Sequence, residues 1–318
     1  MSMSDKPVLT KKIVVIPLTM LCCLLWGSAF PCIKLGCGYS KIASDDACTQ
    51  ILYAGLRFTL AGILALLIGS VIERRLLIPK RETFPKAAKL SLFQTILQYT
   101  FFYIGLSRST GMKSSVITAS NVFLSIIVAA LVFRTEKLTL RKIAGCLIGF
   151  SGVVLINLSG IGGGFRFTGE GFVFLSALSY AFSAGLIKRY SRTEDTVLLS
   201  GWQFVLGGIF MTFLGFVAGG RISVINTKGV MMLIYLAFVS AAAFSIWGIL
   251  LKHNPVSMIS VFGFMNPVFG VILSYLLLSE RSDAGLYRVA VALILVAAGI
   301  ITVNLSPKRG SSVKIKSE

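Results

Sequence analysis

The chain has 318 residues, of which 55% are hydrophobic and only 14% are charged, and its mean hydropathy is +0.85. Because a soluble domain has about 25% charged residues, this composition excludes a soluble protein and predicts an all-α integral membrane protein. The net charge of +19 does not predict a nucleic-acid partner, because the lysines and arginines lie in short loops between apolar segments, where they set the orientation of a membrane protein.

Ten apolar segments are long enough to cross a bilayer as helices. They cover residues 13–33, 50–71, 87–106, 113–133, 142–159, 170–188, 196–217, 229–250, 256–278 and 286–305. The remaining short loops and tails leave no room for a soluble catalytic domain. The first segment begins like a signal peptide, but its apolar run continues to Ile33, so we interpret it as an uncleaved span. Most of the 31 lysines and arginines fall on the side of the N-terminus, which predicts a multi-pass protein of the plasma (cell inner) membrane with both termini cytoplasmic.

An internal repeat organises the chain. Residues 52–69 return as residues 198–215 at a constant offset of 146, and the matching positions include three glycines. The matched glycines are Gly55/Gly201, Gly62/Gly208 and Gly69/Gly215. A membrane helix that recurs halfway along a chain is typical of transporters built from two repeats. Because each repeat has five spans, an odd number, the sequence predicts ten transmembrane helices as two inverted five-helix repeats, with a substrate site near the midplane between them.

The repeats predict three regions. Residues 1–159 form the first repeat with spans one to five, residues 168–306 form the second with spans six to ten, and residues 307–318 form a basic cytoplasmic tail. The Gly-rich stretch Ser159–Gly171 is the natural boundary between the repeats. It is no phosphate loop, because the Lys-Ser/Thr pair does not follow it, and the absence of that motif excludes ATP-driven transport by this chain alone.

Arg57 is the only charged residue well inside a predicted span, and its repeat partner is the neutral Gln203. Charges within a membrane are costly and usually functional, so Arg57 is a possible anchor for a substrate. Two structural alternatives stay open at this point. The side chain either reaches outward to the membrane surface or bonds to carbonyl groups within the bundle.

Several spans carry polar residues at helical spacing. Such stripes either join helices to each other or line a water-filled cavity, and Asn266-Pro267 predicts a break in the ninth span. Tryptophan and tyrosine can close over apolar groups or cations, while amides and hydroxyls orient the polar ends of a solute. The candidate cavity residues are Trp26, Gln98, Tyr103, Thr118, Asn121, Tyr180, Ser183, Trp247 and Asn266.

The sequence predicts no metal site, catalytic residue or cofactor. Its six cysteines have no metal-binding spacing; Cys37 and Cys48 share the first external loop, where either a disulfide or two free thiols is allowed. Every carboxylate and the single histidine, His253, lies in a loop, in a tail or at the end of a span. Because a proton relay within a membrane usually needs such a group, we expect facilitated diffusion or exchange.

The chain resembles the drug/metabolite transporter superfamily in its EamA-like branch, over residues 13 to 305. The residues that carry the resemblance are Trp26-Gly27-Ser28-Ala29-Phe30 with Lys34, Leu56-Arg57-Phe58, Glu136 before a Gly-rich span, Asn266-Pro267-Val268 and Glu280. The family often has proline where this chain has Phe123, so a break in the fourth span is left open. The resemblance implies transport of small metabolites, often export of amino acids or toxic compounds.

We therefore expect a secondary transporter that moves a small neutral or zwitterionic metabolite across the lipid bilayer by alternating access. A proton-coupled multidrug exporter is the alternative. A non-transporting membrane scaffold and a membrane-embedded enzyme are further alternatives, although an enzyme of this kind would need a nucleophile with a base or a metal. The expected partner is the small-molecule substrate, and a homodimer is left open.

Overall fold

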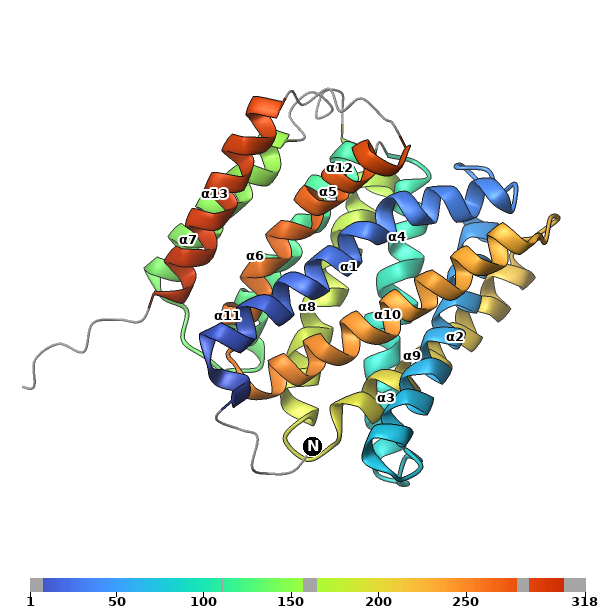
Figure 1. Ribbon diagram of the computed structural model, residues 1–318, viewed down its shortest axis with the longest axis horizontal. Coiled ribbons are helices and arrows are strands. Elements are labelled where there is room, and N and C mark those ends of the chain that lie inside the picture. The colour runs from blue at the N-terminus through green and yellow to red at the C-terminus, as the bar shows by residue number, and fades with distance from the viewer. Residues whose placement is uncertain (1–7, 110, 157–164, 279–285, 306–318) are drawn as a thin grey trace, which may run out of the picture.

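The computed structural model describes residues 8–109, 111–156, 165–278 and 286–305, and every regular element among them is helical (Figure 1). The prediction of an all-helical protein is confirmed, with ten helical segments. In chain order the elements are η2 (Val8–Thr10), α1 (Lys12–Tyr39), α2 (Ala47–Glu73), α3 (Thr83–Ser91), η3 (Leu92–Leu97), α4 (Gln98–Leu106), α5 (Gly111–Ala119), α6 (Asn121–Ile127), η4 (Val128–Val132), α7 (Leu140–Ile156), η6 (Phe167–Gly171), α8 (Phe172–Tyr190), α9 (Thr196–Val217), α10 (Thr227–His253), α11 (Val256–Ser260), η7 (Val261–Phe264), α12 (Met265–Leu278) and α13 (Leu286–Asn304).

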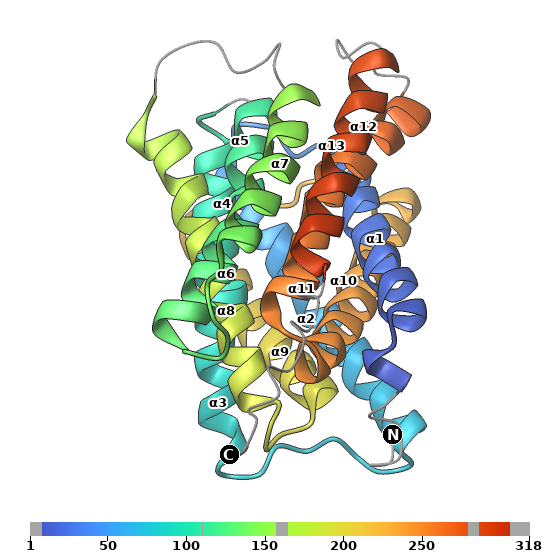
Figure 2. The same ribbon diagram turned by 90° about the vertical axis from the view of Figure 1, so that its left-hand side faces the viewer.

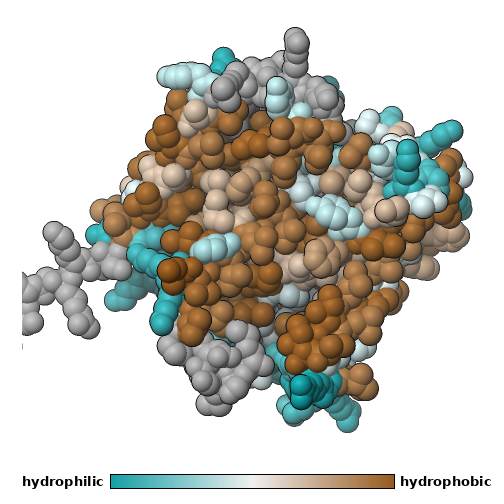
Figure 3. Space-filling model, viewed as in Figure 1, coloured by the Kyte–Doolittle hydropathy of each residue, from teal (hydrophilic) through white to brown (hydrophobic). Residues whose placement is uncertain are grey.

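Eight of the helical segments are long and apolar enough to cross a membrane. The other two are the segment from α3 through α4, which carries buried glutamine and threonine, and α7, which has only 17 residues within the described part of the chain. Hydrophobic side chains cover most of the face seen in Figure 3, and hydrophilic ones gather near its edges. Such a surface suits a lipid environment, in which apolar residues face outward.

Three long helices begin at a side-chain cap. Asp46 accepts a hydrogen bond from the backbone N–H of Thr49 at 2.9 Å, and Asp195 accepts one from Leu198 at 2.8 Å. Asn226 does the same for α10. These caps satisfy backbone donors that the first turn of a helix leaves unpaired, and they fix where α2, α9 and α10 start.

The repeated helices α2 and α9 pack against each other through their matched glycines. A methyl group at Gly62 would lie 2.6 Å from the carbonyl oxygen of Gly201, and one at Gly208 would lie 2.8 Å from that of Gly55. Between these contacts, Phe58 and its repeat partner Phe204 stack with ring centroids 5.2 Å apart and planes 3° apart. Each contact is therefore the repeat image of another, and the small residues let the two backbones approach closely.

The helices α7 and α13 form a second close pair, which lies side by side in Figures 1 and 2. A methyl group at Gly145 would lie 2.9 Å from the carbonyl oxygen of Gly299, and one at Gly299 would lie 2.6 Å from that of Gly145. The glycines of the Gly-rich fifth span therefore allow close packing against the tenth span.

The remaining contacts between the halves also occur in equivalent pairs. Helix α1 packs against α10 and α12, while α8, which occupies the same place in the second half, packs against α4 and α6. Each half thus contributes its first helix to the other half, so that the halves interlock.

The fourth and ninth spans are both interrupted near their middle. The fourth is broken at Ser120, between α5 and α6, and the ninth contains the 3₁₀ turn η7 just before α12. Asn121 and Asn266 follow these two breaks. The break in the fourth span, which the sequence left open because Phe123 replaces a proline, is therefore present.

The first and last described helices meet at one end of the bundle. Lys12 Nζ, at the start of α1, donates to the carbonyl oxygen of Asn304, at the end of α13, at 3.3 Å. Glu280, residues 159–164 of the predicted boundary and the tail 307–318 lie outside the described residues. Cys37 and Cys48 are both free thiols. The predicted domain limits stay a prediction.

Candidate functional site

A cavity of about 270 Å³ lies at the centre of the bundle, between the two halves. Its wall comes from both repeats, because α1, α2, α4, α5 and α6 supply one part and α8, α10, η7 and α12 supply the other. The lining residues include Trp26, Phe30, Lys34, Arg57, Gln98, Tyr99, Phe102, Tyr103, Ser114, Ser115, Thr118, Asn121, Ser176, Tyr180, Ser240, Phe244, Gly263, Asn266 and Pro267. We call this space the central cavity.

Aromatic rings form one end of the central cavity. Trp26 meets Phe244 and Trp247 edge to face, at centroid distances of 5.0 Å and 4.9 Å. Trp247 does not line the cavity but lies one turn further along α10, where it is only 2% exposed. Edge-to-face aromatic contacts of this kind are stabilising and rigid.

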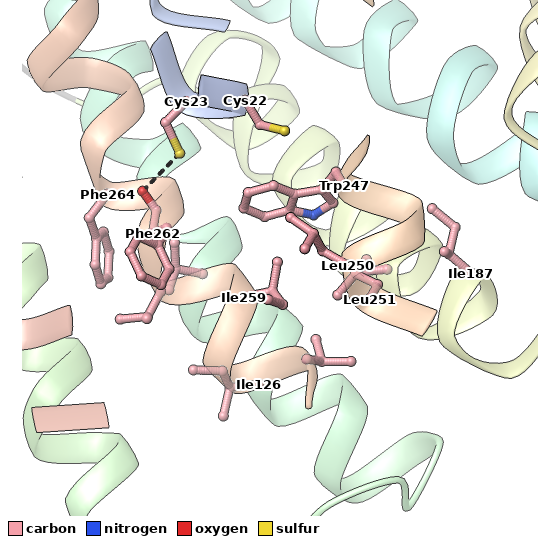
Figure 4. Packing of buried hydrophobic residues seen from close by; sticks show 14 of the residues in the cluster. Cys22, Cys23, Ile126, Ile187, Trp247, Leu250, Leu251, Ile259, Phe262 and Phe264 are labelled. Carbon is pink, nitrogen blue, oxygen red and sulfur yellow. Dashed lines mark hydrogen bonds between the residues drawn. The ribbon is translucent and has the colours of Figure 1, made fainter. Parts of the chain in front are cut away.

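Beyond these rings, an apolar core fills the bundle (Figure 4). Trp247 is followed along α10 by Leu250 and Leu251, which are fully buried, and Ile259 of α11 lies close to them in the same cluster. Cys23 of α1 joins this core and donates to the carbonyl oxygen of Phe262 at 3.2 Å. The wall of the central cavity ends at Phe244 on α10, and densely packed side chains fill the bundle from there to the end where α10 stops.

A lysine closes that end of the bundle. Lys188, near the end of α8, donates to the carbonyl oxygens of Leu251, Lys252 and Asn254 at 2.8, 3.2 and 2.6 Å. Because the last carbonyls of a helix have no partner within the helix, a cation there satisfies them and complements the helix dipole. Asn254 in turn donates to the carbonyl oxygen of Leu9, which ties the segment before α1 to the same place.

The carboxylate of Glu136 binds the start of the neighbouring helix, α11. Glu136 accepts hydrogen bonds from the backbone N–H of Ser257, at 2.8 Å, and from the Ser257 hydroxyl, and it forms an ion pair with Lys142 at 2.5 Å. This carboxylate joins the end of the fourth span to the start of the ninth. We call the end of the bundle held by Lys188 and Glu136 the closed end.

The opposite end of the central cavity reaches the surface. Ile33 and Lys34, near the end of α1, and Leu106, the last residue of α4, belong to its wall. The side chain of Lys34 is exposed. The cavity is therefore sealed toward the closed end and accessible from the other.

Arg57 lines the central cavity from α2 and is only 4% exposed. Its Cζ lies 4.3 Å from the ring centroid of Phe58 and 5.6 Å from that of Tyr99. Its Nε has no hydrogen-bond partner among the residues that the structure describes. Burial excludes the alternative that the side chain reaches outward to the membrane surface.

Several other polar atoms in the wall are buried without a partner in the described part of the protein. They are Trp26 Nε1, Gln98 Oε1, Ser114 Oγ, Thr118 Oγ1 and Asn266 Oδ1. Buried polar groups are costly unless they find a hydrogen bond. Such a set suits a cavity that binds water or a polar solute.

The structure brings most of the predicted site residues together. Trp26, Gln98, Tyr103, Thr118, Asn121, Tyr180 and Asn266 line the central cavity, as does Arg57. Trp247 and Ser183 do not. Ser183 is fully buried and donates to the carbonyl oxygen of Tyr180 at 2.7 Å. A binding role for each of these residues stays a prediction.

Sequence reasoning did not select three of the lining residues with notable chemistry. Tyr99 and Phe102 lie beside the predicted Gln98 and Tyr103, but an aromatic residue in a membrane span carries no signal of its own. The sequence did contain a signal for Lys34, because the pair Ile33-Lys34 occurs again as Ile187-Lys188 in the second half. No group of His, Cys, Asp or Glu within the described ranges could hold a metal ion.

Comparisons with known proteins point to one family. The sequence model of the EamA-like transporter family matches residues 13–158 and 167–305. The "Uncharacterized transporter YvbV" of Bacillus subtilis is 23% identical over 299 residues, which are 92% of each chain. The "Uncharacterized transporter sll0355" of Synechocystis is 27% identical and covers 87% of this chain and 86% of its own.

Two further matches agree with these. The "WAT1-related protein At3g02690, chloroplastic" of Arabidopsis thaliana is 26% identical over 212 residues, which are 63% of this chain and 50% of that protein. A solved crystal structure has the same fold, with a TM-score of 0.75 over 92% of this chain and 97% of its own, at 17% identity.

Proposed function

This chain belongs to the EamA-like transporter family and is a multi-pass membrane transporter, not an enzyme, and we propose that it carries a small metabolite by alternating access through the central cavity. The observation that carries this proposal is the cavity itself. It is walled by both repeats, lined by unpartnered polar atoms and sealed at one end only. A carrier in one of its two conformations has these properties.

We propose further that the two halves are inverted repeats. The stacking of Phe58 on its repeat partner Phe204, and the reciprocal glycine contacts of α2 with α9, support a two-fold relation between the halves. An odd number of spans in each half makes that axis parallel to the membrane plane. The second conformation then follows when the halves exchange their arrangements.

The orientation follows from charge. The closed end is the end at which most lysines and arginines lie in the sequence, and such loops are retained on the cytoplasmic side. We therefore propose an outward-facing state with both termini cytoplasmic, and relatives from bacteria support the plasma membrane as the location. A homodimer stays a prediction.

The substrate class is a small neutral or zwitterionic metabolite, such as an amino acid, and the candidate binding residues are those that line the cavity. A cavity of about 270 Å³ suits a solute smaller than a drug, because pockets for drug-sized ligands are usually about 300–1,000 Å³. Transport runs by facilitated diffusion or exchange. The alternative of proton coupling is decided by the experiment below.

The test is counterflow of labelled amino acids into liposomes that contain the purified full-length protein, without an ion gradient. Thr118→Val keeps the side-chain shape and removes one unpartnered cavity hydroxyl, so counterflow should fall roughly threefold to tenfold, as expected for one lost hydrogen bond. Asn121→Ala should reduce it as well.

The matched control is Thr302→Val in α13. The Thr302 hydroxyl donates to Ala298 of its own helix, at 2.7 Å, and does not line the cavity, so this variant should keep wild-type counterflow. Equal loss in both threonine variants would count against the cavity as the site. Accumulation that requires an imposed pH gradient would favour the proton-coupled exporter instead.

A further inference from the structure

A buried arginine within a membrane protein has to be explained by its surroundings. Arg57 lies well inside α2, at the wall of the central cavity, and is only 4% exposed to solvent. Charged side chains at such depth are costly and face partners or water-filled cavities. A buried charge without a counter-charge is strongly destabilising.

The neighbours of Arg57 do not balance its charge. Two aromatic rings lie against the guanidinium, and the phenol groups of Tyr53, Tyr99 and Tyr103 are close enough to interact with it. These groups are neutral. Within the described ranges no carboxylate forms an ion pair with Arg57, and no acidic residue lines the cavity.

The second charged residue of the wall has the same sign. Lys34 lies at the accessible end of the cavity, so a solute that enters passes this lysine before it reaches Arg57. A cleft lined by one sign of charge concentrates ions of the opposite sign. The charge of Arg57 therefore disfavours organic cations at the buried site.

We propose that the solute carried by this protein bears a carboxylate, which forms an ion pair with Arg57 inside the central cavity. This inference rests on the proposed function, because it takes the central cavity as the transport site. Arginine suits the role because its planar fork binds a carboxylate through two parallel hydrogen bonds. Arg57 Nε is one donor that has no partner among the described residues.

The rest of the cavity fits an apolar body with few polar groups. Trp26, Phe102 and Phe244 supply aromatic surface. Gln98 Oε1 and Asn266 Oδ1 are acceptors without partners in the described structure, and they suit a hydroxyl or an amino group of the solute. Amino acids and simple organic acids both satisfy this description, whereas amines without a carboxylate do not.

Three probes that share one apolar body test the inference. They are 3-phenylpropanoate, 3-phenylpropanamide and 3-phenylpropylammonium, which place an anion, a neutral amide and a cation on the same carbon skeleton. Binding to the purified full-length protein is measured by isothermal titration in detergent, and uptake is measured in liposomes. The carboxylate should bind about tenfold to a hundredfold more tightly than the amide, as expected for hydrogen bonds between charged groups, and the ammonium should bind most weakly.

Substitution of Arg57 supplies a second readout. Arg57→Gln should lower the ratio of carboxylate to amide affinity toward one, and Arg57→Lys should keep part of the preference because it keeps the charge. A residue with a purely structural role would change both affinities together and leave their ratio unchanged. Since the comparison of the three probes uses the native protein, the test holds even where a variant fails to fold.

The outcomes separate this inference from the proposed function. Selective binding of the carboxylate without uptake would retain the anion site and contradict the carrier. Uptake of the amide and the ammonium as fast as the carboxylate would retain the carrier and contradict the anion site. Failure of the carboxylate to bind, or an unchanged affinity ratio in a folded Arg57→Gln protein, would also overturn the inference.

Discussion

At the closed end, the single ammonium group of Lys188 donates hydrogen bonds to three carbonyl oxygens at the end of α10. We expect Lys188→Met to keep the apolar stem and release these carbonyls, so that the junction of α10 and α11 opens more often. Hydrogen–deuterium exchange of residues 250–257 should become about tenfold faster, the lower range for the loss of hydrogen bonds to a charge.

Arg189 supplies the control for that measurement. It is the next residue along α8, its side chain is exposed, and among the described residues it makes no hydrogen bond or ion pair. Arg189→Met should leave the exchange of the same peptide unchanged. Equal exchange in wild-type and Lys188→Met proteins would show that the apolar core alone holds the closed end.

Glu194 makes the stability of the closed end depend on pH. It lies in the loop between α8 and α9, accepts a hydrogen bond from Thr83 at 2.8 Å and pairs with Lys86 at 2.5 Å. Burial alone raises the pKa of Glu194, but the hydrogen bonds from Lys86 and Thr83 outweigh it and lower the pKa below its ordinary value. The carboxylate thus stabilises the folded protein above its unfolded pKa of about 4.3, and this contribution is lost as the pH falls through the lower folded pKa.

The expected result is a pH-dependent difference between two proteins. At pH 7, Glu194→Gln should have a lower melting temperature than the wild type, and the difference should shrink as the pH falls below about 4.3. Thermal unfolding in detergent, followed over pH 3.5 to 7, measures it. A difference that stays constant over this range would show that the charge of Glu194 contributes no stability.

At the scale of helices, the contact between α2 and α9 depends on glycine. A methyl group at Gly62 would meet the backbone oxygen of Gly201 at 2.6 Å, and one at Gly208 would meet the backbone nitrogen of Thr59 at 2.3 Å. Since backbone atoms cannot turn aside, Gly62→Ala and Gly208→Ala should each destabilise the protein by about 1–3 kcal/mol through overpacking. The melting temperature in detergent should fall accordingly.

Gly38 of α1 offers a control with the opposite expectation. Apart from the adjacent residues and the backbone of its own helix, no atom of the described residues lies within 4 Å of the position that a methyl group would take there. Gly38→Ala should therefore leave the stability unchanged or raise it slightly, since alanine is the better helix former. Similar losses at all three glycines would indicate that helix propensity, not close packing, sets the effect.

The helices themselves were predictable, because most spans are long and predominantly apolar segments with polar ends. The second span, predicted over residues 50–71, corresponds to α2 at Ala47–Glu73. The break at Ser120 was not predictable from a helix breaker, since no proline occurs nearby. Phe123 stands at the place of Pro267 in the repeat, so the sequence left this break open. The break at Ser120 therefore depends on how the two interrupted spans pack in the folded protein.

The candidate site was predictable in part, for a geometric reason. Helical spacing places Ser240, Phe244 and Trp247 on one face of α10, and that face does point to the centre of the bundle. Spacing does not say where along the helix a cavity ends. Ser240 and Phe244 line it, whereas Trp247 belongs to the apolar core below it. The burial of Arg57 likewise depends on neighbouring helices that a single span cannot reveal.

At the scale of the whole molecule, the charge of Arg57 bears on how the proposed alternating-access carrier returns after it releases a solute. Alternating access requires that the central cavity pass through a state closed at both ends. With a bound carboxylate the cavity is close to neutral at Arg57. Without one, an unpaired buried cation remains, which costs several kcal/mol. The loaded carrier should therefore reorient faster than the empty carrier.

This difference predicts exchange as the preferred mode of transport. Efflux of labelled 3-phenylpropanoate from liposomes should become at least about tenfold faster when the same unlabelled carboxylate is present outside, since 1.4 kcal/mol of barrier corresponds to a factor of ten. The amide added outside serves as the control and should not accelerate efflux, because it cannot neutralise Arg57. Exchange of one anion for another moves no net charge, so the accelerated flux should also be insensitive to an imposed membrane potential, whereas the slow net efflux should respond to it. Equal efflux with and without the external carboxylate would mean that the empty carrier returns freely, and that the buried charge of Arg57 is compensated by another group when the cavity closes.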